Sequence, residues 1–189
     1  MIRLGFAVTG SFCTFADAFA AMERLQALGI YDLHPIFSEA AAGFDTRFGK
    51  AEAHLRRATE ICGRAPITTI VGAEPIGPKK ALDALLIAPC TGNTLAKLAA
   101  GIADTAVTLA AKAHLRNGRP IIVAVSSNDA LAAGAKNIGS LQNRKHYYFV
   151  PLRQDAPLGK PTSVVADFSL IEPTVEAALA GIQVQPLLL

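Results

Sequence analysis

The sequence predicts a three-layer α/β/α fold of Rossmann-like type, built around a mainly parallel sheet. Apolar runs of strand length alternate with segments of helical spacing along the whole chain. Several of these runs are apolar on both faces, as is typical of strands that helices cover on both sides. With 189 residues, of which 51% are hydrophobic, the chain is long enough to bury a full α/β core. We therefore expect one domain over residues 1–189.

The first third of the chain contains two strands and a helix between them. Residues 2–9 form an apolar run typical of a buried strand, and residues 14–28 have helical spacing that Gly29 ends. Residues 31–38 form a second strand. Because proline has no N–H to donate to a neighbouring strand, Pro35 indicates an edge position or a bulge for this strand.

The middle of the chain begins with a helix over residues 51–62, which Gly63 follows. Residues 67–71 are expected to form a short strand. Residues 82–88 form a continuous apolar strand. An alanine-rich helix follows this strand, after a turn that contains proline, threonine, glycine and asparagine.

The alternation continues in the second half of the chain. The expected elements are a helix over 105–116, a strand over 120–126, a helix over 131–143, a strand over 147–150 and a helix over 172–180. Asp104 is expected to cap the first of these helices. The segment 153–163, which is rich in proline and charge, has no regular pattern.

Composition excludes several classes of protein. The net charge of +3 is too small, and too evenly spread, to indicate nucleic-acid binding. No apolar run approaches the roughly 18 residues of a membrane span, and the N-terminus has no signal-peptide pattern, so we expect a cytoplasmic protein. Three cysteines without CxxC spacing and four scattered histidines indicate neither a disulfide framework nor a metal site.

Only 17% of the residues are charged, and a surface so poor in charge is typical of a homo-oligomer, with an unusually buried monomer as the alternative. We expect the alanine-rich helices over residues 96–113 to meet in its interface, because small side chains let helices approach closely. Lys97 is expected to make contacts across that interface.

Ligands of such sheets bind outside the carboxyl ends of the strands, so the residues that follow each strand carry most of the functional information. Small hydroxyl residues and glycines at the start of helices suit a phosphate, because free N–H groups and the helix dipole favour an anion there. The predicted cofactor-binding residues are Thr9, Gly10, Ser11, Ser38, Pro89, Thr91, Asn93, Thr94, Ser126 and Asn128.

An alternative is that Ser11 and Asn93 simply cap the helices that follow them. The GxGxxG and GxxxxGK[ST] patterns are both missing, so neither the common dinucleotide fingerprint nor a P-loop is present.

The segment APCTGNTLAKLAAGIADT, residues 88–105, resembles the Pro-x-Ser/Thr-x-Asn-Thr motif of the FMN-binding flavoproteins related to phosphopantothenoylcysteine decarboxylase and flavin prenyltransferase. The opening segment VTGSFCTF is similar to the first Gly-Ser turn of that family. The resemblance implies a flavoprotein-type fold, FMN as the cofactor, and Asn93 as a residue close to the flavin.

The chain departs from the decarboxylases of that family in two ways. It has Ser-Ser-Asn-Asp over residues 126–129 where they carry a Pro-x-Met-Asn type of segment, and no histidine matches the one on which they rely. These departures argue against cysteine decarboxylation and leave the FMN-binding frame intact. A flavin-dependent decarboxylase-like activity is kept only as an alternative.

Segments along the whole chain resemble one branch of this family, the B subunits of dipicolinate synthases. They are GFAVTGSFCTF, FDTRFGKAE, AEPIGPKKALDALLIAPCTGNTLAKLA, AAKAHLRNGRPIIVAVSSNDAL, AKNIG, YYFVPLRQD and IQVQPLLL. The resemblance implies a role in the last step of dipicolinate formation, from a product of the lysine pathway, during spore formation. It also implies a partner, the A subunit of dipicolinate synthase, which carries a nicotinamide-dependent dehydrogenase function.

A dicarboxylate substrate needs cationic partners, and a guanidinium group pairs with a carboxylate through two hydrogen bonds. Arg47 and Lys50 are therefore candidate catalytic residues together with Asn93, although a solvated loop with an Asp45–Arg47 pair is an equal alternative. The chain is then either an FMN-dependent enzyme subunit that oxidises a dihydropyridine precursor, or a non-catalytic subunit that binds nucleotide or substrate and stabilises the A subunit.

Two further side chains are candidate reactive groups. Cys90 lies beside the predicted site, where a packing role is favoured over a redox role because no base accompanies the thiol. His114 lies between Lys112 and Arg116, where a surface or interface role is favoured over catalysis.

Overall fold

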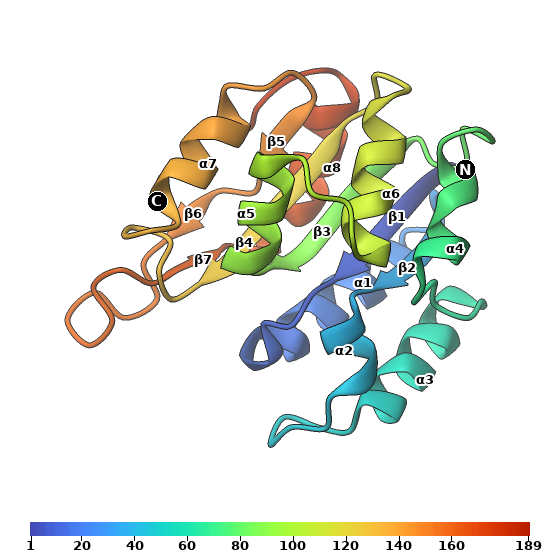
Figure 1. The fold of residues 1–189 in the computed structure, drawn as a ribbon, viewed down its shortest axis with the longest axis horizontal. Helices are drawn as coiled ribbons and strands as arrows, with labels where there is room; N and C mark the ends of the chain where they lie inside the picture. The colour runs from blue at the N-terminus through green and yellow to red at the C-terminus, as the bar shows by residue number, and fades with distance from the viewer.

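The computed structural model describes residues 1–189 and contains one seven-stranded sheet between two layers of helices (Figure 1). The strand order is β2-β1-β3-β4-β7-β6, and β5 pairs with β4. The strands are β1 (Ile2–Val8), β2 (Tyr31–Phe37), β3 (Ala84–Cys90), β4 (Ile121–Ser127), β5 (Tyr147–Phe149), β6 (Leu152–Arg153) and β7 (Val164–Ala166). The first five strands run parallel, and β6 and β7 are antiparallel additions. The predicted fold class, α/β with a mainly parallel sheet, is confirmed.

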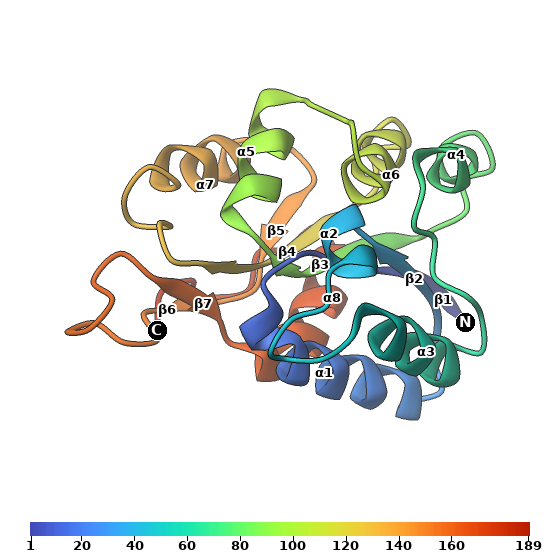
Figure 2. The ribbon, with the colours of Figure 1, turned by 60° about the horizontal axis from the view of Figure 1, so that its bottom comes forward.

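Helices cover both faces of the sheet, as Figure 2 shows. One face carries α4 (Ile70–Ala73), α5 (Gly92–Ala100), α6 (Ala106–Leu115) and α7 (Ala135–Gln142), and the other carries α1 (Phe15–Ala27), α3 (Ala51–Cys62) and α8 (Ile171–Leu179). The short helix α2 (Glu39–Gly43) follows β2 directly at the carboxyl edge of the sheet. Short 3-10 helices cover Phe12–Thr14, Glu74–Ile76 and Phe168–Leu170. None of the helices is both long and apolar enough to cross a membrane.

The core is one cluster of 50 buried residues. Every residue of β3 is buried, because helices cover this central strand on both faces. Its continuous apolar sequence follows from that position, since a strand with one solvated face would alternate apolar and polar residues. The central strands end in polar turns at one edge of the sheet, and that edge holds the candidate site.

The expected strand over residues 67–71 is wrong. Only Ile67 pairs with the sheet, through Ile36, and helix α4 begins at Ile70. The Thr69 hydroxyl accepts a hydrogen bond from the N–H of Gly72, and this N-cap stabilises a helix where the apolar run alone indicated a strand. The edge position expected for β2 from Pro35 is confirmed by the strand order.

Two helix starts also differ from expectation. Thr105, rather than Asp104, caps α6, and the Thr105 and Thr108 side chains form a reciprocal capping box. Helix α7 begins at Ala135 rather than near residue 131, because the preceding residues turn around the carbonyl of Asp129, which accepts from the N–H groups of Ala132 and Gly134.

The segment 153–163 connects β6 and β7, which form a two-stranded extension beyond the parallel sheet (Figure 2). These strands were not expected, because two or three residues are too few for a periodic pattern to show.

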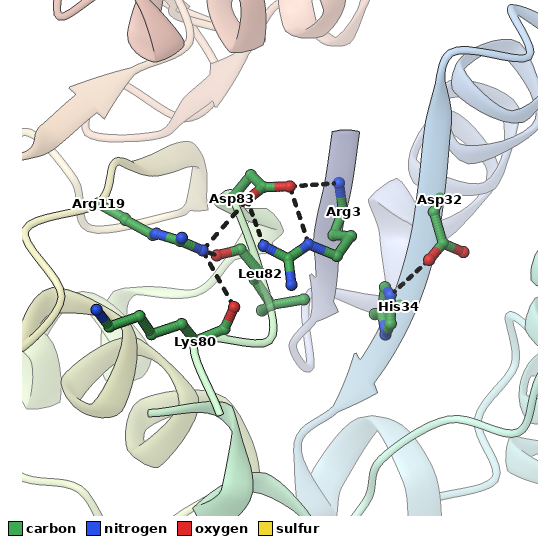
Figure 3. A network of polar contacts seen from close by, with 7 residues as sticks. All are labelled: Arg3, Asp32, His34, Lys80, Leu82, Asp83 and Arg119. Carbon is green, nitrogen blue, oxygen red and sulfur yellow. Dashed lines mark hydrogen bonds and ion pairs between the residues drawn. The ribbon is translucent and has the colours of Figure 1, made fainter. Parts of the chain in front are cut away.

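At the amino-terminal edge of the sheet, opposite the candidate site, Asp83 joins two arginines (Figure 3). The Asp83 carboxylate accepts hydrogen bonds from Arg3 at 2.6 Å and from Arg119 at 3.2 Å. Arg119 also donates to the carbonyls of Leu82 and Lys80. This network ties the starts of β1, β3 and β4 together.

Candidate functional site

A pocket of about 400 Å³ lies at the carboxyl edge of the sheet, where β1, β2 and β3 end. Its lining residues are Gly10, Ser38, Glu39, Ala40, Phe44, Thr91, Asn93, Thr94, Lys97 and Thr105. The structure thus brings together five of the ten predicted cofactor-binding residues, from three turns that are far apart in the sequence. A larger pocket, of about 600 Å³, lies between α1 and β7; two arginines and three aspartates line it, and it contains none of the predicted cofactor-binding residues.

Three helices begin at the smaller pocket, and each is capped by a hydroxyl residue that lines it. Ser38 caps α2, Thr91 caps α5 and Thr105 caps α6. Each cap accepts a hydrogen bond from the N–H three residues further on, at 3.3, 3.1 and 3.1 Å respectively. Thr105 was not among the predicted residues, because Asp104 was assigned as the cap. The positive ends of three helix dipoles therefore meet at one place.

Backbone donors at this pocket are left without partners. The N–H groups of Gly10, Glu39, Ala40 and Asn93 make no hydrogen bond within the chain, and the same holds for Gly92 next to Asn93. The first N–H groups of a helix have no acceptor inside the helix, so they are available to an anion. The pocket therefore has the donor set that a phosphate group requires.

The charged side chains of the pocket are few. Lys97 donates to both carboxylate oxygens of Asp104, at 2.9 and 3.0 Å, and these hydrogen bonds hold the pKa of Asp104 below its usual range. The carboxylate of Glu39 belongs to the first turn of α2. Because the single lysine is already paired, an anion would be held mainly by backbone N–H groups and hydroxyls.

Thr9 and Pro89 lie beneath the pocket and hold its turns together. The Thr9 hydroxyl, 1% exposed, donates to the carbonyl oxygen of Pro89 at 2.7 Å and accepts from the N–H of Thr91 at 3.0 Å. The loops after β1 and β3 are thereby joined. Because the Thr9 hydroxyl both donates and accepts a hydrogen bond within the chain, Thr9 supports the pocket from below and does not line it.

Ser11, Ser126 and Asn128 lie outside the pocket lining. The hydroxyl oxygens of Ser11 and Ser126 are 2.6 Å apart, and Ser11 does not cap the helix that follows it. Asn128 accepts from Thr162 at 2.6 Å through its carbonyl oxygen and from Ser163 at 3.4 Å through its side chain. These contacts link the end of β4 to the turn after β1 and to the β6–β7 extension.

Arg47 and Lys50 lie on the exposed loop between α2 and α3, and neither forms an ion pair. The Arg47 guanidinium lies 4.8 Å from the centre of the Phe48 ring. The alternative pairing of Asp45 with Arg47 is not present, since the Asp45 carboxylate accepts from the N–H of Ala51 at 2.9 Å, at the start of α3. Both cations are free to bind a carboxylate, but neither lines the pocket.

Cys90 and His114, the two candidate reactive groups, are both buried in the chain. Cys90 is fully buried, and burial raises the pKa of its thiol, which agrees with the packing role expected for it. The surface or interface role expected for His114 is wrong, because the residue is 0% exposed within the single chain. His114 lies on the inner face of α6 and its Nε2 donates to the Pro120 carbonyl at 3.0 Å, while burial lowers its pKa to about 4.

No cluster of three or more His, Cys, Asp or Glu side chains could hold a metal ion.

Comparison with known protein families gives one family. The model of the family described as Flavoprotein matches residues 1–172, which is most of the chain.

Individual proteins and solved structures are also similar to this chain. The B subunit of dipicolinate synthase from Bacillus subtilis (strain 168) is 40% identical over 186 residues, which are 98% of this chain and 92% of that protein. The crystal structure of the B subunit of dipicolinate synthase from Bacillus halodurans C matches with a TM-score of 0.91 and 41% identity, over 100% of this chain and 96% of that chain. The FMN-dependent cysteine decarboxylase SpaF shares the fold at 24% identity and a TM-score of 0.71, over 94% of this chain and 97% of that one.

Proposed function

Since the chain belongs to the flavoprotein family, we propose that the pocket at the carboxyl edge of its sheet binds FMN through the phosphate group. One observation carries this proposal. Three capped helix N-termini, with unpartnered N–H groups, converge on a single pocket of about 400 Å³. A phosphate monoester matches such a site, because it accepts many hydrogen bonds and carries the negative charge that helix N-termini favour.

The residues that would donate to the phosphate are Gly10, Ser38, Asn93 and Thr94, which line the pocket. Thr91 and Thr105 line it as well and would fix the helix N-termini there, because their own N–H groups are bonded within the chain. Thr9 and Pro89 would support them from below. Ser11, Ser126 and Asn128 continue the same edge of the sheet and are proposed to contact the rest of the cofactor. A dinucleotide is a poorer match, because the glycine-rich fingerprint that receives a pyrophosphate is absent.

The reaction that we propose is the oxidation of a dihydrodipicolinate-type precursor, from the lysine pathway, to dipicolinate during sporulation. The 40% identity to the B subunit of a dipicolinate synthase over 98% of the chain supports this assignment. A bound FMN would supply an acceptor for two electrons. Arg47 and Lys50 would bind the two substrate carboxylates, since both cations lack an acidic partner in the chain. Asn93 would orient the substrate or flavin beside the phosphate site.

We propose that activity requires a second chain, the dehydrogenase (A) subunit of the same enzyme, and that the chain also associates with itself. The alanines of α6 at positions 106, 110, 111 and 113 are buried inside the chain, so they do not form a free face. Exposed apolar side chains elsewhere, such as Ile102 and Val71, remain available for contact. Light scattering at micromolar concentration should give a mass above that of one chain, and a monomer mass would exclude the self-association.

A second candidate is a non-catalytic subunit that holds nucleotide or substrate and stabilises the A subunit. It is favoured by the pocket's lack of an evident acid–base pair, since Glu39 is the only titratable acid in its lining. A decarboxylase-like activity is a third candidate, supported by the shared fold.

The deciding experiment measures oxidation of dihydrodipicolinate by the isolated A subunit, by this chain alone and by the two together, each with and without FMN. FMN-dependent turnover that appears only with this chain supports the enzyme proposal. An FMN-independent stimulation of the dehydrogenase supports the binding role instead.

A further inference from the structure

Ser127 and Asp129 form a hydrogen-bonded pair beside the start of α5. The Ser127 hydroxyl donates to the Asp129 carboxylate, and the N–H of Asp129 approaches the same hydroxyl oxygen at 3.4 Å. Ser127 is the last residue of β4, and Asp129 follows it at the carboxyl edge of the sheet. The pair therefore lies at the same edge of the sheet as the proposed phosphate pocket.

The pair lies directly against Gly92, the first residue of α5. A β-carbon at position 92 would lie 2.6 Å from the Ser127 hydroxyl oxygen and 2.7 Å from a carboxylate oxygen of Asp129. Only glycine therefore lets the carboxylate approach the helix so closely. Thr91 and Asn93, the neighbours of Gly92 in sequence, both line the proposed phosphate pocket. The carboxylate is thus one residue away from that pocket, on the side of α5 that faces the end of β4.

Asp129 is available for chemistry. Its side chain is exposed and no Lys, Arg or His pairs with it. Of its two carboxylate oxygens, one accepts from Ser127 and the other accepts from no group of the chain. The segment is also held in position, because Asn128 accepts hydrogen bonds from Thr162 and Ser163. An oriented carboxylate with one free oxygen is suited to accept a proton.

We propose that Asp129, oriented by Ser127, is the proton acceptor of the reaction at this site. The inference rests on the proposed oxidation. Conversion of a dihydropyridine dicarboxylate to the pyridine breaks one ring C–H bond and one further ring bond to hydrogen. A bound oxidised flavin would supply the acceptor for the first hydrogen, which leaves as a hydride with its electron pair. The electron pair of the second bond stays in the ring and completes the aromatic system, and its proton passes to the Asp129 carboxylate, which returns it to water.

A structural role for Asp129 makes a different prediction. A carboxylate near a helix N-terminus also stabilises the helix, and in that case its removal would disturb α5 and with it the phosphate pocket. FMN affinity and turnover would then fall together. For a proton acceptor, turnover falls while the affinities for FMN and for the product dipicolinate are preserved.

The test compares Asp129→Asn, Asp129→Glu and Ser127→Ala with the wild type, with the A subunit present and FMN saturating. Asp129→Asn keeps the shape and an acceptor for Ser127, and its kcat should fall about 100-fold or more, the usual effect of losing a general base. Asp129→Glu should recover part of the rate, and Ser127→Ala should lose less than Asp129→Asn. Glu60→Gln, which neutralises an exposed and unpaired acid on α3, is the matched control and should behave as the wild type.

Calorimetric titration of each variant with FMN and with dipicolinate completes the test. Dissociation constants within about threefold of the wild type, combined with the loss of kcat, support the proposal. Wild-type kcat in Asp129→Asn overturns it, and so does a parallel loss of FMN affinity. If the wild type itself binds FMN but does not oxidise dihydrodipicolinate, the proposed reaction fails and this inference fails with it.

Discussion

The hydroxyl group of Thr91 donates a hydrogen bond to the hydroxyl oxygen of Thr94 at 3.0 Å, across the first turn of α5. Thr91 also accepts from the N–H of Thr94, so its own hydroxyl is fully engaged in the cap. The hydrogen of the Thr94 hydroxyl has no acceptor in the chain and remains free to donate into the pocket. The first turn of α5 thus directs one hydroxyl to the helix and another to a ligand.

Thr94→Val is expected to weaken FMN binding about tenfold or more, because it removes a donor to a charged phosphate oxygen, an interaction that contributes about 1.5–3 kcal/mol. Turnover at saturating FMN should change little. The matched control is Thr174→Val, which removes another buried hydroxyl, bonded to the Leu170 carbonyl in α8 on the opposite face of the sheet. Fluorescence titration measures the FMN affinity of both variants. If Thr94→Val binds FMN as tightly as the Thr174→Val control and the wild type, Thr94 is not part of the phosphate site.

Arg47→Ala is expected to lower kcat/KM for the dicarboxylate about ten- to hundredfold while FMN affinity stays unchanged, because Arg47 itself does not line the pocket. Arg47→Lys should restore only part of the loss, since an ammonium group keeps the charge but not the two-bond geometry. Arg56→Ala, an exposed and unpaired arginine on α3, is the control. Steady-state kinetics with the A subunit present decides the matter, and a fully active Arg47→Ala would assign Arg47 to a solvated loop.

His114 should make the protein less stable as the pH falls from about 6.5 to about 4. Burial lowers its pKa from 6.5 to about 4, so within this window the unfolded chain binds a proton that the folded chain does not. The stabilisation of the folded state by neutral His114 is fully present above pH 6.5 and is lost toward pH 4. This change in the free energy of unfolding amounts to at most about 3 kcal/mol. Urea unfolding at several pH values should give a flatter profile for His114→Gln than for the wild type. Parallel profiles would show that His114 titrates normally.

Asp83 should make the folding stability depend on pH in a lower range than His114 does. Hydrogen bonds from Arg3 hold its pKa down, at about 2 instead of 3.8, so its stabilisation is present above pH 3.8 and lost as the pH falls toward 2 (Figure 3). Because the Asp83 side chain is 31% exposed, screening reduces the expected effect to about 1 kcal/mol. Asp83→Asn should lose this amount at pH 7 in urea unfolding. A variant as stable as the wild type at pH 7 would mean that the network contributes nothing.

Much of the fold follows from the sequence, because long apolar runs covered on both faces leave a clear pattern. Strands β1, β2, β3 and β4 were expected close to their observed ends for this reason. The small strands β6 and β7 depend on pairing with distant residues, and their two or three residues have no pattern of their own. The same limit applies to residues 67–71, where one threonine cap decided between strand and helix.

The lining of the candidate pocket was predictable where its residues directly follow strands. Gly10, Ser38 and Thr91 were identified because parallel strands bring their carboxyl ends to one edge. Thr105 and Lys97 were missed as lining residues, since they come from the start of α6 and the second turn of α5. The Ser127–Asp129 pair was missed as well, because its significance depends on contact with Gly92, a residue distant in sequence.

The central claim is that the three converging helix N-termini form an FMN site, and isothermal titration of the purified chain with FMN, FAD and NAD tests it most directly. We expect FMN to bind in a ratio of one per chain and more tightly than either dinucleotide, because the pocket offers donors for one phosphate and the chain has no dinucleotide fingerprint. Binding of NAD with higher affinity than FMN, or no heat of binding with FMN, would contradict the account.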